Sequence, residues 1–275
     1  MITATATVGL SGKVAVVTGG GGAICGAMAK ALAEAGVAVA VWDRALPAAR
    51  TVAGEIEGHG GRGVAVLCDV LDPDEVERAT RDTVAAFGTI DILINGAGGS
   101  RKEATTAPDL SFFDIGAEAL MQTVALNYAG LVIPSQAVGR LFAKRQAGVI
   151  LNIASIAGML PLTRAVGYSN GKAAAISFTQ WLAVHMAQTY SPRIRVNAIA
   201  PGFVLTDQNR FLLTDEKTGE PTERGRQIIQ STPMGRYGEP EEMVGAALWL
   251  VSDSARFVTG TVIPVDGGFT AYAGV

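Results

Sequence analysis

Residues 14–26 read Val-Ala-Val-Val-Thr-Gly-Gly-Gly-Gly-Ala-Ile-Cys-Gly, an apolar run that leads into four glycines. The run Val14–Thr18 has the composition of a strand buried on both faces, and the pattern of residues 27–35 predicts a helix. Glycines between such a strand and such a helix let backbone N–H groups meet a pyrophosphate, because no Cβ blocks the approach. The segment therefore predicts a dinucleotide-binding turn, with an ordinary tight turn as the alternative.

The same alternation of strand and helix continues along the chain. Because the strand patterns are apolar throughout, they favour a parallel sheet covered on both faces. No linker of different composition divides the chain, so we expect one domain over residues 1–275, an α/β doubly wound fold with a seven-stranded parallel sheet flanked by helices. The further predicted strands are 37–42, 63–67, 91–95, 148–153, 194–199 and 260–265, and the further predicted helices are 45–58, 72–87, 112–144, 166–188 and 240–251.

Residues 207–236 interrupt the alternation of predicted strands and helices. The segment is charged, contains Gly219-Glu220-Pro221 and follows the sixth predicted strand. A long insertion after the carboxyl end of a strand is typical of a lid over a substrate site. A solvated surface loop is the alternative interpretation.

The composition excludes several classes of protein. Of 275 residues, 49% are hydrophobic and 17% are charged, which indicates a folded chain. A net charge of −3 argues against binding of nucleic acid, and two cysteines with two histidines leave no basis for a disulfide framework or a metal site. Because neither a membrane span nor a signal-peptide pattern occurs, we expect a cytoplasmic protein that acts on a small molecule.

Acidic and small residues follow three successive predicted strands. Asp43 ends the second strand, where a carboxylate accepts hydrogen bonds from an adenosine ribose and repels a 2′-phosphate. This favours NAD over NADP, although Arg44 is adjacent and arginine pairs well with phosphate. Asp69 follows the third strand and the Asn95-Gly96-Ala97-Gly98 segment follows the fourth. Ligands of open α/β sheets bind at this edge.

Tyr168 and Lys172 are the candidate reactive pair. They lie four residues apart on one face of a predicted helix. An ammonium beside a phenol favours the phenolate, so we expect Lys172 to lower the pKa of Tyr168 toward the working pH. Ser155, at the end of the fifth strand, is placed to hydrogen-bond the same substrate oxygen. Taken alone, the pair is equally consistent with a helix surface.

Together these motifs resemble those of the short-chain dehydrogenase/reductase family over nearly the whole chain. The resemblance implies a single Rossmann-fold domain and an NAD(P)-dependent oxidoreductase that interconverts a secondary alcohol and a ketone by hydride transfer. The matching features are the glycine-rich turn at 18–26, the Asn-Asn-Ala-Gly motif at 95–98, the helix asparagine Asn127, the serine Ser155, the Tyr-x-x-x-Lys motif at Tyr168 and Lys172, and the Pro-Gly pair Pro201 and Gly202.

The resemblance also assigns roles to individual residues. Tyr168 would be the general acid/base, and Ser155 would orient the substrate oxygen. Lys172 would bind the nicotinamide ribose and tune Tyr168, and Asn127 would hold a water in a proton relay. The residues that would contact the cofactor, NAD with NADP as the alternative, are Gly19, Gly22, Ala23, Ile24, Asp43, Asp69, Val70, Asn95, Ala97, Gly98, Tyr168, Lys172, Pro201, Gly202, Val204 and Thr206.

Two departures from the family pattern stand out. Ala23 and Cys25 replace glycines of the usual turn, so we expect a slight shift of the backbone path. Gly96 replaces the second asparagine of the usual motif, which removes a side-chain hydrogen bond between strands. Cys25 is interpreted as a small packing residue, with a redox-sensitive thiol as the alternative.

Within the family, the chain is most similar to the D-mannonate oxidoreductase (fructuronate reductase) group. The likeness rests on residues 111–114, 178–185, 200–203, 208–213 and 265–269. A sugar acid would then contact Ser155, Tyr168 and Arg210, whose guanidinium would pair with the carboxylate. Arg101, Lys102 and Arg164 are alternative anchors.

Other functions stay open. A gluconate, a polyol or another carbonyl compound is the alternative substrate, and a non-catalytic nucleotide-binding protein is the less favoured reading. The family resemblance also implies a homotetramer or homodimer, for which the apolar residues 269–275 are a candidate contact.

Overall fold

All seven predicted strands pair in one parallel sheet. The computed structural model describes residues 8–206, 210, 213–215 and 218–274. The strand order is β3-β2-β1-β4-β5-β6-β7, which confirms the doubly wound fold expected from the sequence. The strands are β1 (Val14–Thr18), β2 (Ala38–Asp43), β3 (Arg62–Leu67), β4 (Ile92–Asn95), β5 (Gly148–Ile153), β6 (Ile194–Pro201) and β7 (Val262–Val265).

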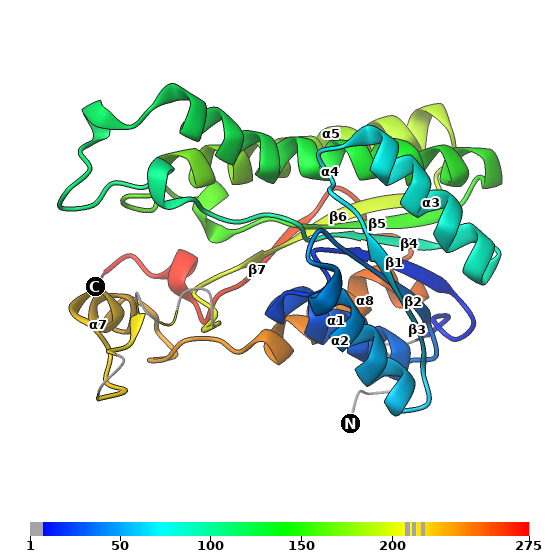
Figure 1. Ribbon diagram of the computed structural model, residues 1–275, viewed down its shortest axis with the longest axis horizontal. Coiled ribbons are helices and arrows are strands. Elements are labelled where there is room, and N and C mark those ends of the chain that lie inside the picture. Colours follow the sequence, from blue (N-terminus) through cyan, green and yellow to red (C-terminus); the bar gives the residue numbers. More distant parts are fainter. Residues whose placement is uncertain (1–7, 207–209, 211–212, 216–217, 275) are drawn as a thin grey trace.

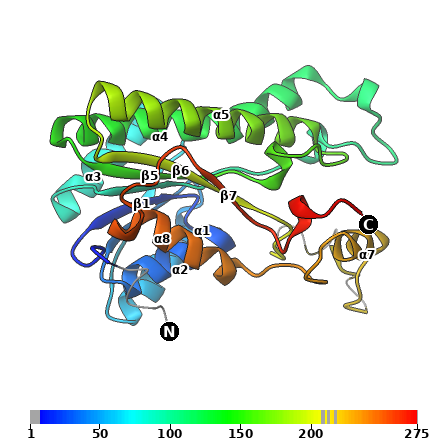
Figure 2. The ribbon, with the colours of Figure 1, turned by 180° about the vertical axis from the view of Figure 1, so that it is seen from behind.

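Helices cover both faces of this sheet (Figures 1 and 2). One layer holds α1 (Ala23–Glu34), α2 (Leu46–Gly58) and α8 (Val244–Val251). The other layer holds α3 (Pro73–Phe87), α4 (Ala117–Arg145) and α5 (Val166–Thr189). Helix α7 (Glu223–Gln230) lies beyond the sheet, near the C-terminus and at the same end as the connection that follows β4 (Figure 1).

Two apolar cores follow from the alternation of side chains along buried strands. Val17 packs into the core beneath α1, α2 and α8, whereas the adjacent Val16 packs into the core beneath α3, α4 and α5. All five residues of β1 are buried. Trp42 is completely enclosed, and its indole N–H donates to Thr83 Oγ1 at 3.0 Å. The central strands are therefore rigidly held, and so are the residues at their carboxyl ends.

Several helix boundaries differ from those predicted. Helix α1 begins at Ala23 rather than at residue 27, because the Gly26 N–H already bonds to the Gly22 carbonyl at 2.7 Å. Two predicted helices are split, since short 3₁₀ turns at Phe112–Asp114 and Pro240–Met243 precede α4 and α8. None of the described helices combines the length and the apolar composition that crossing a membrane requires.

Candidate active site

The glycine turn after β1 is closed by direct backbone packing. Gly19 has a φ of +63°, and a Cβ there would lie 2.9 Å from the Cα of Ala97. A Cβ on Gly21 would lie 2.7 Å from the Cβ of Ala48. Side chains at these positions would push the turn away from β4 and α2. The glycines are therefore required where they stand, as expected for a turn that brings its backbone close to a ligand.

The turn leads into a helix N-terminus that suits an anion. Gly22 caps α1 without a side-chain hydrogen bond, and no acidic residue lies in the first turn. The first N–H groups of any helix have no partner inside it and carry the positive end of the helix dipole. Ala23, Ile24 and Cys25 are the first residues of α1 and present such groups. This cradle fits the pyrophosphate of a dinucleotide.

Asp43 fixes the neighbouring end of β2. Its two carboxylate oxygens accept backbone N–H groups, Oδ2 from Gly21 at 3.1 Å and Oδ1 from Ala45 at 2.8 Å. The carboxylate is thereby held against the glycine turn, where further lone pairs can accept ribose hydroxyls. At the end of β3, Asp69 Oδ1 accepts from the Leu71 N–H at 2.9 Å, and Val70 is buried.

Asn95 lies beneath the site rather than in it. Its side chain is fully buried and donates to Ser135 Oγ and to Asn152 Oδ1, both at 2.9 Å. The side chain thus joins β4 to α4 and β5, and the cofactor contact of Asn95, which stays a prediction, falls to its backbone. Beside it, Thr18 Oγ1 accepts the N–H groups of Gly96 and Ala97.

The two departures from the family motifs form one packing arrangement. A Cβ on Gly96 would overlap the Sγ atom of Cys25, so the thiol fills the space that a side chain at position 96 would take. Burial raises the pKa of the Cys25 thiol to about 12, which keeps it protonated. Cys25 is therefore a packing residue, in agreement with the favoured interpretation of the sequence.

Ser155, Tyr168 and Lys172 are brought together where β5 meets α5. Lys172 Nζ donates to the Ile153 carbonyl at 2.7 Å and lies 5.6 Å from the centre of the Tyr168 ring. Ser155 Oγ accepts from the Ala157 N–H at 3.1 Å, and its side chain hydrogen-bonds the Tyr168 phenol. The constellation predicted from the spacing is therefore assembled at the carboxyl edge of the sheet.

Burial controls the protonation of this pair. The pKa of Tyr168 is raised, because burial disfavours the phenolate more than the hydrogen bond with Ser155 favours it. Burial likewise lowers the pKa of Lys172 to about 8. The expectation that Lys172 lowers the pKa of Tyr168 is thus wrong, because burial raises this pKa and the hydrogen bond with Ser155, rather than the charge of Lys172, opposes the rise.

Asn127 on α4 is fully buried and holds the loop after β4. Its Nδ2 donates to the carbonyls of Gly99 at 2.8 Å and Thr123 at 2.9 Å, and its Oδ1 accepts from the Gly99 N–H at 3.1 Å. A Cβ on Gly98 would lie 2.8 Å from Asn127 Oδ1 and 3.2 Å from Lys172 Nζ. The side chain of Asn127 therefore positions this loop, in addition to any contact with water.

The residues after β6 also lie at the carboxyl edge of the sheet. Pro201 ends β6, and a Cβ on Gly202 would lie 2.7 Å from the Cα of Asp266. Val204 is buried, and the Thr206 carbonyl accepts from the Arg210 N–H at 2.9 Å. Within the predicted lid, residues 207–209, 211–212 and 216–217 lie outside the described residues. The part of the predicted lid that the structure describes contains helix α7, which was not predicted from the sequence.

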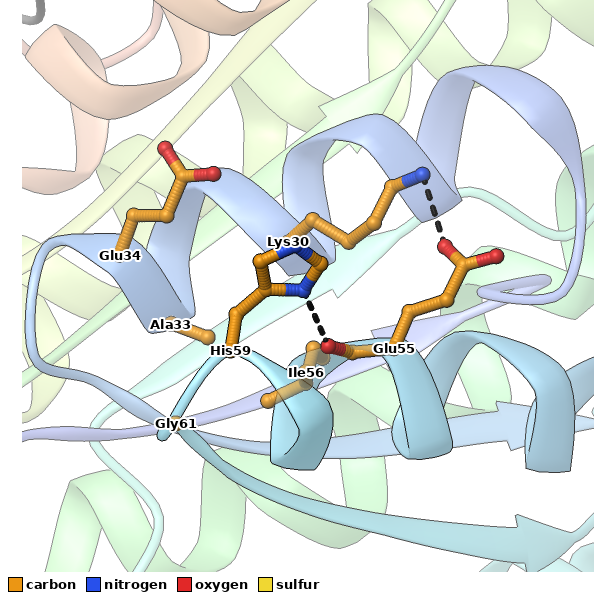
Figure 3. Close-up of a pocket in the computed structure, with 7 residues that line it drawn as sticks. All are labelled: Lys30, Ala33, Glu34, Glu55, Ile56, His59 and Gly61. Atoms are coloured by element: carbon orange, nitrogen blue, oxygen red, sulfur yellow. Dashed lines mark hydrogen bonds and ion pairs between the residues drawn. The ribbon is translucent and has the colours of Figure 1, made fainter.

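A separate surface hollow lies between the C-terminal turns of α1 and α2 (Figure 3). Lys30 Nζ donates to Glu55 Oε2 at 3.0 Å, and His59 Nδ1 lies 2.7 Å from the Glu55 carbonyl oxygen. These groups satisfy one another, and they sit at the end of α1 that is remote from the glycine turn. Among the residues that the structure describes, no three His, Cys, Asp or Glu side chains are grouped to hold a metal ion.

A dinucleotide cradle next to a Ser-Tyr-Lys constellation defines a nicotinamide-dependent oxidoreductase of the Rossmann fold. A family model described as enoyl-(acyl carrier protein) reductase matches residues 21–270. An oxidoreductase of uncharacterized activity from Bacillus subtilis, UxuB, is 43% identical over 97% of this chain and 98% of its own length. The chain belongs to the short-chain dehydrogenase/reductase family and is an NAD(P)-dependent oxidoreductase.

Two solved structures are similar over almost their whole length. A Haemophilus influenzae protein with bound NAD, provisionally named a D-mannonate oxidoreductase, has a TM-score of 0.92 and 40% identity, covering 99% of this chain and 100% of that one. A Beutenbergia cavernae protein, provisionally named an NAD(P)-dependent gluconate 5-dehydrogenase and containing NADP at low occupancy, has a TM-score of 0.84 and 32% identity, covering 96% and 98%.

Proposed function

We propose that this protein interconverts a secondary alcohol and a ketone on a sugar acid of the D-mannonate/D-fructuronate type, with NAD as the preferred cofactor. The observation that carries the reaction type is the contact of Ser155, Tyr168 and Lys172 at the carboxyl edge of the sheet. The substrate class is supported by the similarity to the Haemophilus influenzae protein, which extends over 99% of this chain at 40% identity.

The proposed proton transfer runs through Tyr168. Because Ser155 Oγ already accepts the Ala157 N–H, its own proton is directed outward, toward the substrate oxygen or the phenol. In the reduction direction, the Tyr168 phenol, which burial keeps protonated, gives its proton to the substrate carbonyl oxygen and regains one from solvent. A bound NADH would supply the hydride to the carbonyl carbon, so that the ketone, the reduced cofactor and one proton give the alcohol and the oxidised cofactor; oxidation of the alcohol follows the same path in reverse.

Lys172 has a positioning role in this scheme. Its ammonium lies against the Tyr168 ring and next to the space in front of Gly98, so it is placed to hydrogen-bond a ribose of the nicotinamide half. The adenosine half is proposed to lie over Asp43, Asp69 and Val70. A carboxylate clamped at the end of β2 favours a free 2′-hydroxyl over a 2′-phosphate, which is why NAD is preferred.

A gluconate, a polyol or another carbonyl compound is the second candidate substrate, and the similarity to the Beutenbergia cavernae protein favours gluconate among these. The deciding experiment measures kcat/KM with NAD and with NADP for D-mannonate, D-gluconate, D-mannitol and a steroid alcohol. We expect the highest kcat/KM for D-mannonate with NAD. A higher value for a neutral polyol or for the steroid would contradict it.

A homotetramer or homodimer is also proposed, because α4 and α5 expose large apolar side chains. Met121, Trp181 and Val184 are 66%, 60% and 56% exposed, and Trp181 stacks on His185 at 4.8 Å. Several large exposed apolar side chains on two neighbouring helices are typical of an interface. Sedimentation equilibrium should give a mass of two or four chains, and Trp181→Glu should shift it toward one.

A further inference from the structure

We propose that Asn152 and Thr179 are positioning residues for the proton transfer, and that they hold the helix carrying Tyr168 and Lys172 in register against β5. This inference rests on the proposed role of Tyr168 and adds two residues that lie in the core beneath the site. Asn152 is the residue before the last in β5, and Thr179 lies near the middle of α5. Both side chains are completely buried.

The contact between the two residues belongs to a chain of hydrogen bonds that runs from the sheet into the helix. Asn152 Oδ1 accepts from Asn95 Nδ2 at 2.9 Å, and Asn152 Nδ2 donates to Thr179 Oγ1 at 2.9 Å. Thr179 Oγ1 donates in turn to the Ala175 carbonyl at 2.8 Å. Because a carbonyl can only accept, the Thr179 hydroxyl has to accept from Asn152, which turns the oxygen of the Asn152 amide toward Asn95. The orientation of each group in the chain is therefore fixed.

The half of α5 that carries Tyr168 and Lys172 has a smooth packed face. Apart from Lys172, its buried residues are Gly167, Gly171 and Ala175. Side chains as small as these interlock little with their neighbours, so packing alone does not fix the helix along its axis. A buried hydrogen bond is satisfied in one position only and therefore specifies the register.

Two hydrogen bonds join α5 to consecutive residues of β5. Lys172 Nζ donates to the Ile153 carbonyl at 2.7 Å, and Thr179, about 10 Å further along the helix, accepts from Asn152. The flexible stem of Lys172 can follow a shift of the helix, whereas the short side chains of Asn152 and Thr179 cannot. A rigid helix carries an axial shift along its whole length, and a misplacement of about 1 Å is enough to slow catalysis about 100-fold.

A second threonine ties another helix to the sheet in the same way and supplies a matched control. Thr83 in α3 is completely buried, donates to the Ala79 carbonyl at 2.8 Å and accepts from Trp42 Nε1 at 3.0 Å. Helix α3 lies in the same layer as α5 but carries none of the reactive residues (Figure 1). Thr83→Val and Thr179→Val should therefore lower the Tm by similar amounts, whereas only Thr179→Val should affect the proton transfer.

Steady-state kinetics of the oxidation separate the two effects, with NAD and the alcohol of the panel above that gives the highest kcat/KM. Thr179→Val should lower kcat about 10- to 100-fold, while KM changes by less than about threefold. Thr179→Ser, which keeps the hydroxyl, should recover most of the activity, and Thr83→Val should keep the wild-type kcat. In Thr179→Val the pKa seen in the pH profile of kcat should move upward, because the hydrogen bond with Ser155 that opposes the rise of the Tyr168 pKa is loosened.

Asn152→Leu breaks the same contact from the strand. The double variant that combines this change with Thr179→Val should be no slower than the slower single variant, since the contact is already lost. Additive losses, an unchanged kcat and pH profile in Thr179→Val, or an equal fall of kcat in Thr83→Val would each overturn the inference. An active Tyr168→Phe variant would refute the proposed proton transfer and this inference together, whereas an inactive Tyr168→Phe beside an unaffected Thr179→Val would refute the inference alone.

Discussion

The Sγ atom of Cys25 lies where a side chain on residue 96 would project, so Cys25 and Gly96 share one volume beneath the glycine turn. Each residue departs from its family motif, and each departure makes room for the other. The loop after β4 can therefore stay close to the turn, with the N–H groups of Gly96 and Ala97 on Thr18 Oγ1. The complementary sizes of the two residues preserve this part of the cofactor cradle.

Gly96→Ala should therefore destabilise the protein by about 1–3 kcal/mol, the usual result of overpacking a closed site. Adding Cys25→Ala should recover most of that loss, because the methyl group then has space. Urea unfolding of the two single variants and the double variant measures the coupling. Gly54→Ala, at an open helical position, is the control and should not destabilise. Strictly additive effects of the two changes would mean that the residues do not share a volume.

Neither cysteine should react in the folded protein. Burial raises the pKa of both Cys25 and Cys68 to about 12, so the thiolate is scarce at neutral pH. Titration with a disulfide reagent at pH 8 should label neither thiol in the native state and both in denaturant. Rapid native labelling of Cys25 would indicate a reactive thiol at the turn.

Lys172 should make stability depend on pH in the alkaline range. Its pKa falls from 10.5 in an unfolded chain to about 8 in the fold, so between these values the unfolded chain binds the additional proton. The contribution of this group to the free energy of unfolding thus rises with pH across that window. Below about pH 8, the fold bears the full cost of a buried ammonium.

Lys172→Met should accordingly raise the Tm of the cofactor-free protein relative to wild type most at pH 7, with the difference shrinking toward pH 10.5. Thermal unfolding over this pH range provides the measurement. A difference that stays constant with pH would show that Lys172 is not desolvated.

Asp43 should determine the choice of cofactor. Asp43→Asn keeps an acceptor oxygen for one of the two backbone N–H groups and removes the charge that repels a 2′-phosphate. The ratio of NADP to NAD affinity should rise about tenfold, which corresponds to ~1.4 kcal/mol. Fluorescence titration of NADH and NADPH checks this, with Asp69→Asn as a comparison at the next strand. An unchanged ratio would place the ribose elsewhere.

The strands and the helix face that carries the reactive pair were predicted correctly, because each depends on residues close together in the sequence. An apolar run such as Val14–Thr18 indicates a buried strand by itself, and the spacing of Tyr168 and Lys172 places both on one helix face. What the sequence did not show depends on tertiary surroundings. Burial reverses the expected shift of the Tyr168 pKa, and the Asn95 side chain is engaged by Ser135 and Asn152 from two other elements.

The complementarity of Cys25 and Gly96 shows the same limit more clearly, since the two positions are 71 residues apart and meet only when β1 pairs with β4.

The most direct test of the account is the turnover of Tyr168→Phe at saturating NAD and D-mannonate. We expect kcat to fall by at least about 100-fold, the usual contribution of a general acid/base, while the Kd of NADH stays within about twofold. Tyr190→Phe, at an exposed position at the opposite end of α5, should keep full activity. Turnover of Tyr168→Phe near the wild-type rate, with cofactor binding intact, would contradict the central claim that this phenol moves the proton.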